Sequence, residues 1–433
     1  MPKRPITIDA KSIPKKRIHQ DALRVVSRLR RQGHEAYLVG GCVRDLLLGR
    51  RPKDFDIATA AHPRQIRRIF RNARIIGRRF KLAHIFYGDH ILETATFRSA
   101  PQSDDDEDDL LITDDNDFGT AQSDALRRDF TINGLFLDPI DMEIHDWVGG
   151  LDDVDEGVLR TIGDPYVRMA EDPVRILRAV KFATRLGFRI EDDTWEAMLA
   201  HAPELERAAP PRILEEIMRL SASGTALGSF RMMRACGALA VLLPELDAFV
   251  GERDVSDKDV RDRADRYWRL LGALDADVQA GNEPSRAVCL AVLWLRLIEH
   301  HAGLVDNMLH QEPDVDLFDV VTEHLEPLVQ DSRLPRRTFI IARRIIAEQF
   351  RFDDVPGDDA RAKLFTLTEH FPDALHLFKL RCRAWGQGWQ RYEAWEQTYQ
   401  EMEKASDEEV QGLRKKGRRR KRRRPRKRRR SKT

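Results

Sequence analysis

The sequence of 433 residues predicts an α+β fold, in which an N-terminal mixed α/β head is followed by an all-helical neck and body. Four short runs rich in β-branched and aromatic residues predict strands in the head, at residues 36–41, 55–59, 83–87 and 91–97. After Asp164 such runs nearly vanish, and helical spacing of apolar residues continues to about residue 405. The change of pattern separates an α/β part from a helical part.

The head is expected over residues 21–150, after a basic flexible arm at 1–20. Its first helix has Leu23, Val26 and Leu29 at spacings of three and ends near Gly33. Strands and helical pieces then alternate until residues 103–117, where nine of fifteen residues are acids. With almost nothing apolar to pack, this stretch predicts a flexible surface loop.

The helical part is expected to form a neck at 151–250, which binds nucleotide or RNA, and a body at 251–405, which binds RNA. The neck contains EDPVRILRAVKFATRLG, where Asp172 can cap a helix, Pro173 fits its first turn and Gly187 ends it. In the body, one helical face carries five aromatic residues, for which core packing is favoured over base stacking: Trp385, Trp389, Tyr392, Trp395 and Tyr399.

The charge is strongly segregated along the chain. The formal net charge is +2, but residues 414–432 contain 16 cations and no acid, so the remainder carries 2 − 16 = −14. Such a block repels itself and cannot be buried, which predicts a disordered basic tail at 406–433. Its Arg density favours RNA contact over a merely solubilising role.

Cysteine usage and hydropathy exclude several classes of protein. Four scattered cysteines without a CxxC pair argue against disulfide staples and structural zinc. The longest apolar run, residues 287–295, is far shorter than a membrane span, so no membrane insertion is expected. Because no secretion signal is apparent either, the expected location is cytoplasmic.

The strongest local motif is LVGGCVRDLLLGRRPKDFDIAT at 38–59. A strand leads into glycines and a helix, so Gly41 lets a backbone amide approach an anion, and Arg44 lies one turn further on. Asp54 and Asp56, two residues apart on a second strand, point to one face, where they can share Mg²⁺. A lone DxD or GG is usually a surface turn, but in this order the two predict nucleotidyl transfer.

Further candidates follow along the chain. Glu93 can face the same site from a neighbouring strand, or be an ordinary strand acid. RRDFTINGL at 127–135 offers Arg128 for a phosphate or ribose and Asp129 as a third or an orienting carboxylate. Asp172, Arg175 and Arg178 recur every three residues, which suits either a salt bridge or hydrogen bonds to a base edge.

These motifs, in this order, resemble the class II nucleotidyltransferases of the polymerase-β superfamily, which comprise bacterial poly(A) polymerases and tRNA CCA-adding enzymes. The resemblance runs from about residue 20 to about 245. It implies a polymerase-β-like head and a two-metal Mg²⁺ site, for which Mn²⁺ can substitute. It also implies the following roles: metal ligation by Asp54 and Asp56, catalysis by these two and Asp129, and nucleotide binding by Gly41, Arg44, Arg128, Asp172, Arg175 and Arg178.

Within the family, GRRFKLAH at 77–84, APPRILEEIMRL at 209–220 and the basic tail resemble the poly(A) polymerase branch. The resemblance implies transfer of AMP from ATP to RNA 3′ ends, with release of pyrophosphate, in RNA turnover together with RNA-processing proteins that the sequence does not identify. A tRNA CCA-adding enzyme is the alternative, and a non-catalytic RNA-binding protein a further one. Whether Asp129 or Glu93 completes the carboxylate set stays open at this point.

Overall fold

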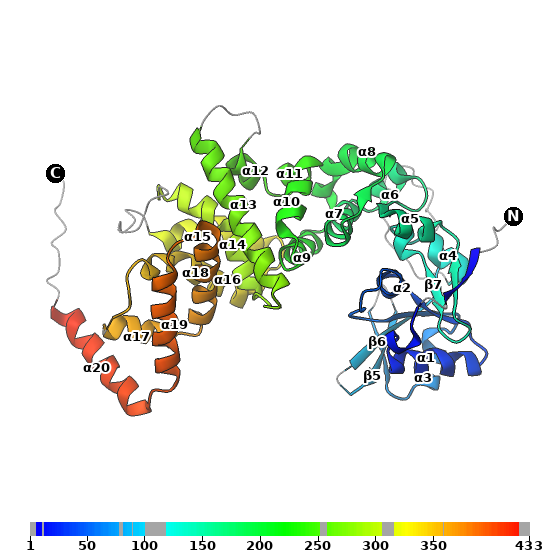
Figure 1. Ribbon diagram of the computed structural model, residues 1–433, viewed down its shortest axis with the longest axis horizontal. Coiled ribbons are helices and arrows are strands. Elements are labelled where there is room, and N and C mark those ends of the chain that lie inside the picture. The colour runs from blue at the N-terminus through cyan, green and yellow to red at the C-terminus, as the bar shows by residue number, and fades with distance from the viewer. Residues whose placement is uncertain are drawn as a thin grey trace. The chain divides into compact units, whose positions relative to one another are not determined.

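The computed structural model describes residues 6–10, 13–77, 81–88, 90–99, 118–251, 258–304, 316–357 and 359–423 (Figure 1). The acidic loop at 103–117 and the end of the basic tail, from residue 424, lie outside the described residues. The chain divides into two compact units, Met1–Ala208 with Ala235–Val241, and Ala209–Arg234 with Leu242–Thr433. The boundaries expected at residues 150 and 250 stay predictions.

The described strands of the first unit form an eight-stranded sheet in the order β1-β8-β7-β2-β3-β6-β5-β4. Their bounds are β1 Ile6–Asp9, β2 Ala36–Val39, β3 Asp56–Thr59, β4 Ala73–Ile76, β5 Leu82–Tyr87, β6 His90–Thr96, β7 Phe136–Asp138 and β8 Glu143–Asp146. Neighbouring strands are antiparallel except β3 and β6, which are parallel. The four predicted strands are confirmed as β2, β3, β5 and β6.

The two faces of this sheet have different coverings. Helices α1 Gln20–Arg31 and α3 Pro63–Ile69 pack side by side on one face (Figure 1). On the other face, Val39, Ala58 and Phe136 form an apolar cluster with Ala121 and Ala125 of α4 Ala121–Leu126. Because side chains alternate along a strand, Asp56 shares the α4 face with Ala58, whereas Ile57 faces the opposite way. This register decides which polar groups can meet.

The remaining elements of the first unit lead into helices. They are α2 Gly41–Leu47, α5 Gly150–Glu156, α6 Pro165–Glu171, α7 Val174–Leu186, α8 Asp192–His201, the 3₁₀ turns η2 Lys15–Arg17, η3 Thr131–Asn133 and η4 Ala202–Arg207, and the parallel strands β9 Val158–Leu159 and β10 Arg189–Ile190. The predicted end of α7 is confirmed, since Gly187 has φ 75° and its N–H bonds the carbonyl of Ala183. The expected cap differs, because Pro173 is the N-cap of α7 and Asp172 is the C-cap of α6.

All the regular elements described in the second unit are helices, as the sequence predicts. Its core helix is α14 Arg286–His301, which packs against α16 Arg336–Ala347 and α18 Phe371–Trp385. The other helices are α9 Pro210–Ser221, α10 Ala226–Ala235, α12 Pro244–Val250, α13 Lys258–Gln279, α15 Leu317–Gln330, α17 Ala360–Thr366, α19 Trp389–Glu403 and α20 Asp407–Arg423, with α11 Ala238–Leu242 at the boundary of the units. None of the described helices has the length and apolar character needed to cross a membrane.

Three expectations differ from the structure. The arm at 1–20 is not without structure, because alternating Ile6, Thr7 and Ile8 form β1 on the edge strand β8. The tail is helical up to Arg423, since α20 packs on α17 and its first turn is acidic. The aromatic face is split between α18 and α19, because Gly386 and Gly388 have φ values of 70° and 92°.

Core packing is confirmed for part of the aromatic set. Trp395 is 3% exposed, and its ring lies 5.3 Å from that of Phe352 between centroids. The ring of Tyr399 lies 5.2 Å from that of Phe371. The four cysteines are all buried and unpaired, as expected for a chain without disulfides: Cys42, Cys236, Cys289 and Cys382.

Candidate active site

Two acidic side chains lie on adjacent parallel strands of the sheet. The pairing of Ile57 with Thr94 places Asp56 at the start of β3 beside Glu93 of β6, both on the face that carries α4. Asp54 lies two residues before β3 and is exposed. The strand therefore begins slightly later than predicted, but the two aspartates remain neighbours in space, as their electrostatic interaction shows.

Desolvation and neighbouring negative charge together raise the pKa of Asp56. Its pKa is raised to about 6, first because the surrounding protein desolvates the carboxylate and then because Glu93 and Asp54 repel its charge. Arg128 opposes this effect. Three carboxylates on an open strand end supply only oxygen donors, which are the ligands that hard divalent cations prefer. The types of donor therefore suit a divalent metal ion, although the structure does not bring one oxygen from each of Asp54, Asp56 and Glu93 within 4.8 Å of the other two.

The glycine turn makes room for Arg128. Gly40 has φ 72°, and a Cβ built there would lie 2.9 Å from Nη1 of Arg128. Nη2 of Arg128 donates to Asp124 at 3.0 Å, and its guanidinium lies 5.1 Å from the centroid of the Phe136 ring. Its buried Nε has no hydrogen-bond partner among the described residues. Arg128 is thus a cation held beside the carboxylates with a spare donor.

Arg44 has a different environment from the one expected. It is 2% exposed, its Nη1 donates to Oδ1 of Asn133 at 2.6 Å, and its Nε donates to Asp45 at 2.9 Å. The guanidinium therefore ties α2 to η3 and does not face solvent. A nucleotide contact by Arg44 stays a prediction, and it would require the guanidinium to exchange these partners. Gly41, by contrast, begins α2 directly after the turn.

Asp129 forms an ion pair with Arg178 of α7. One carboxylate oxygen accepts from Nε of Arg178 at 2.8 Å and from Nη2 at 2.5 Å, while the other accepts from the N–H of Phe130 at 2.8 Å. The Arg178 charge and these hydrogen bonds outweigh desolvation and lower the pKa of Asp129 to about 2. Because its oxygens are committed to these donors, the geometry favours Glu93 over Asp129 as the third carboxylate beside Asp56.

The predicted stripe of Asp172, Arg175 and Arg178 is wrong as one helical face. Asp172 precedes α7, with φ −150° and ψ 89°, so its side chain does not follow the helical repeat. Arg175 is buried and donates to Glu171 at 3.0 Å and to the carbonyl of Arg168. Of these three residues, only Arg178 combines a place on α7 with partial exposure, at 35% of its side chain.

Comparison with known proteins identifies the family. A family model described as the Poly A polymerase head domain matches residues 36–160. A model of a probable RNA and SrmB-binding site of polymerase A matches 187–250, and one of the polymerase A arginine-rich C-terminus matches 311–430. Poly(A) polymerase I of Salmonella typhi is 35% identical over 386 residues, which cover 86% of this chain and 80% of that protein. The chain belongs to the poly(A) polymerase I family.

Other similar proteins include both poly(A) polymerases and CCA-adding enzymes. Poly(A) polymerase I of Haemophilus influenzae is 43% identical over 248 residues, 55% of this chain and 54% of that protein. A CCA-adding enzyme of Geobacillus thermodenitrificans is 36% identical over 227 residues, 52% of this chain and 55% of that protein. The solved CCA-adding enzyme of Bacillus stearothermophilus, in complex with CTP, matches with a TM-score of 0.65 and 24% identity, over 88% of this chain and 82% of that one.

Family membership confirms both the resemblance and the α+β fold class. The protein is a nucleotidyltransferase, and enzymes of this family generally use divalent metal ions. The structure also shows a residue that sequence reasoning missed. Asp124, 3% exposed, accepts hydrogen bonds from both Arg127 and Arg128. In the sequence, Asp124 lies three residues before Arg127 and four before Arg128 on a helical segment, and this spacing could have predicted the ion pairs.

Proposed function

We propose that the protein adds AMP from ATP to RNA 3′ ends, without a template, and releases pyrophosphate. The observation that carries this proposal is the cluster of Asp54, Asp56 and Glu93 beside Arg128 on one sheet face. The cluster lies within the segment that matches the Poly A polymerase head domain. The similarity to poly(A) polymerase I over most of the chain supports ATP and RNA as the substrates.

The proposed metal ligands are Asp54 and Asp56, with Glu93 as the third carboxylate. Mg²⁺ is the proposed ion at a two-metal site, with Mn²⁺ as a substitute, because all the donors are carboxylate oxygens. When bound, such ions activate an attacking hydroxyl and stabilise a departing pyrophosphate. The exposure of Asp54 and Asp56 leaves the site open to a nucleotide and a primer end.

The neighbouring residues have separate proposed roles. Arg128 supplies positive charge for the triphosphate and partly offsets the repulsion around Asp56. Asp129 orients Arg178, whose partly exposed guanidinium can donate to the nucleotide. Asp172 lies between α6 and α7, and Arg175 is held by Glu171, so contacts of these two residues with the base are the least direct part of the proposal.

Similarity to poly(A) polymerase I extends along more of the chain than similarity to CCA-adding enzymes. The Salmonella typhi relative aligns with 86% of this chain, whereas the CCA-adding enzyme of Geobacillus thermodenitrificans aligns with 52%. The match to the arginine-rich C-terminus, at residues 311–430, includes the later part of the body and most of the basic tail. These observations favour polyadenylation over CCA addition, although the structural neighbours share only the fold.

Release of pyrophosphate tests the enzymatic proposal. Purified protein, an RNA primer, ATP and Mg²⁺ should give continuous release of pyrophosphate, which should stop after chelation by EDTA and return when Mg²⁺ or Mn²⁺ is added. ATP without primer is the control for simple hydrolysis. Absence of release with every RNA primer tried would favour the alternative of a non-catalytic RNA-binding protein.

The body offers a basic groove for the proposed RNA contact. It has a volume of about 440 Å³ and is lined by Arg336, Arg337 and Arg344 of α16, with Ile340 among them. Arg337 is already paired with Glu369. No ion pair involves Arg336 or Arg344 within the part of the chain that the structure describes. Two exposed cations beside an apolar side chain suit a phosphate backbone with its bases.

The basic tail gives a prediction about salt. If it engages about six phosphates of single-stranded RNA, log affinity should fall with log salt at a slope of about −4. Because α20 packs on α17, replacing the 16 cations of 414–432 by glutamine is a cleaner change than deletion. We expect a flatter slope and a higher KM for RNA, with kcat at saturating primer little changed. If the glutamine variant shows the same dependence of log affinity on log salt as the wild type, the tail does not bind RNA and serves only solubility.

A further inference from the structure

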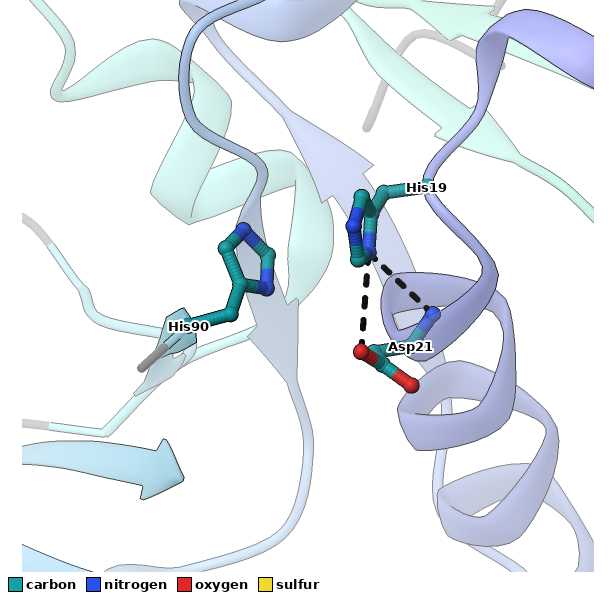
Figure 2. Close-up of side chains that lie close together, drawn as sticks. All are labelled: His19, Asp21 and His90. Carbon is teal, nitrogen blue, oxygen red and sulfur yellow. Dashed lines mark hydrogen bonds and ion pairs between the residues drawn. The ribbon is translucent and has the colours of Figure 1, made fainter. Parts of the chain in front are cut away.

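A second group of metal-binding side chains lies on the opposite face of the sheet from the carboxylates. His19 is the N-cap residue of α1, Asp21 lies in the first turn of that helix, and His90 begins β6. Figure 2 shows the two imidazole rings facing each other, with Asp21 beside them, across the space between the helix and the strand. The residues come from segments about seventy positions apart, so the fold itself brings them together.

The donor atoms of this group converge. One ligand atom from each of His19, Asp21 and His90 lies within 4.8 Å of the other two. The two rings are 4.1 Å apart between centroids. Oδ1 of Asp21 accepts from Arg24 at 2.7 Å, which leaves Oδ2 on the side of His19, 3.8 Å from its Nδ1. All three side chains are half-buried.

One nitrogen in the group lacks the partner that burial normally demands. Nδ1 of His90 is buried and has no hydrogen-bond partner among the residues that the structure describes. Nδ1 of His19 accepts only a long hydrogen bond, 3.3 Å from the N–H of Asp21. Buried polar atoms are rarely left unpaired, because each one costs about 1–3 kcal/mol. A cation bound between the rings would give Nδ1 of His90 a partner, with a ring nitrogen of His19 and Oδ2 of Asp21 as the further ligands.

We propose that His19, Asp21 and His90 form a transition-metal site, distinct from the divalent site at Asp54 and Asp56. Two imidazole nitrogens and one carboxylate oxygen are donors typical of Zn²⁺, whereas Mg²⁺ prefers oxygen alone. Tetrahedral Zn²⁺ with bonds near 2.0–2.2 Å needs donors roughly 3.3–3.5 Å apart. Rotations of the three partly exposed side chains can close the remaining gap, and water completes the fourth position.

A metal at this site would link the start of α1 to β6, on the sheet face opposite to Asp56 and Glu93. The ring of His19 lies 6.3 Å from that of Phe55 between centroids. Phe55 is buried, and in the sequence it stands between Asp54 and Asp56. His90 shares the helix-covered face of β6 with Leu92, whereas Glu93 shares the opposite face with Asp56. A metal here would therefore act as a structural clamp and would not contact the substrate.

The test is Zn²⁺ and Co²⁺ binding to the full-length protein carrying Asp54→Ala and Asp56→Ala, which weakens binding at the catalytic carboxylates. We expect one tightly bound ion, a visible Co²⁺ absorption band of tetrahedral type, and a Tm raised by about 3 °C or more when Zn²⁺ exceeds Kd ten-fold. His19→Asn and His90→Gln in the same background should weaken binding at least about 10-fold. Asparagine at position 19 keeps an N-cap acceptor, so folding of α1 is preserved.

The matched control is His84→Gln on the neighbouring strand β5, where His84 lies 3.5 Å from Glu93. This variant should bind Zn²⁺ as tightly as its parent. The proposal is overturned if the parent binds no Zn²⁺ or Co²⁺, if binding is equal in the His19→Asn and His90→Gln variants, or if only His84→Gln removes it. Because the readouts are binding and Tm, they do not depend on AMP transfer.

Discussion

Replacing Asp54 by alanine is expected to lower AMP transfer about 10³-fold or more, since a lost metal ligand removes several kcal/mol of transition-state stabilisation. The same change should move the Tm by less than about 2 °C, because Asp54 is exposed and outside regular structure. Initial rates with an RNA primer and ATP, together with a thermal unfolding curve, measure both quantities on one preparation.

The matched control for this variant is Asp155→Ala, which removes an exposed carboxylate from α5. It should keep both the activity and the Tm of the wild type. Glu93→Gln should also reduce kcat if Glu93 is the third carboxylate beside Asp56. An Asp54→Ala variant that kept a substantial part of the wild-type rate would remove the basis for the metal assignment.

Replacing Asp129 by asparagine is expected to affect stability and nucleotide binding together. Asp129 is 10% exposed and Arg178 35%, so solvent partly screens the pair and the loss should be about 1–2 kcal/mol near neutral pH. Arg178 would lose its orientation, and a charge-assisted hydrogen bond to the nucleotide is worth enough to raise the KM for ATP about 10-fold. Urea unfolding and ATP titrations measure the two effects.

The pH dependence of this loss follows from the lowered pKa of Asp129, about 2 in the folded protein. A carboxyl whose pKa is depressed on folding contributes its full stabilisation above its unfolded pKa, near 3.9. That contribution is lost as the pH falls towards 2. The difference in unfolding free energy between wild type and Asp129→Asn should thus be constant from pH 5 to 8 and shrink below pH 4.

Asp138→Asn separates the structural from the catalytic part of this prediction. Asp138 pairs with Arg30 at 2.5 Å, and their side chains are 7% and 36% exposed, much like Asp129 and Arg178. It should cost similar stability but leave the KM for ATP unchanged. If both variants, or neither, raise the KM, Asp129 is not a positioning residue for the nucleotide.

Much of the fold was predictable because periodicity reports burial directly. The strands β2, β3, β5 and β6 and the long helices were expected, and the end of α7 at Gly187 followed from a local rule of helix termination. Strand β1 was missed because its residues are exposed and depend on pairing with β8, a contact between distant segments. Local composition carries no information about such a partner.

The candidate site was predictable in its residue types but not in its partners. The spacing of two singled out Asp54 and Asp56 from sequence alone, although only Asp56 lies in β3. The proposal of Glu93 as the third carboxylate, by contrast, rests on the β3–β6 register and the Arg178 ion pair. Arg44 looked available because its position on α2 was clear, while its hydrogen bond to Asn133 joins residues 89 apart. A local sequence pattern does not show which polar groups from distant segments pair in the fold.

Incubation of the purified protein with labelled oligo(A), or with tRNA lacking its 3′ end, and each nucleotide in turn tests the central claim most directly. With Mg²⁺ and ATP alone, we expect a long ladder of added residues on oligo(A), no matching ladder with CTP, and none with the Asp54→Ala variant. Arrest after a few additions that require CTP, on tRNA only, would contradict polyadenylation and identify CCA addition instead.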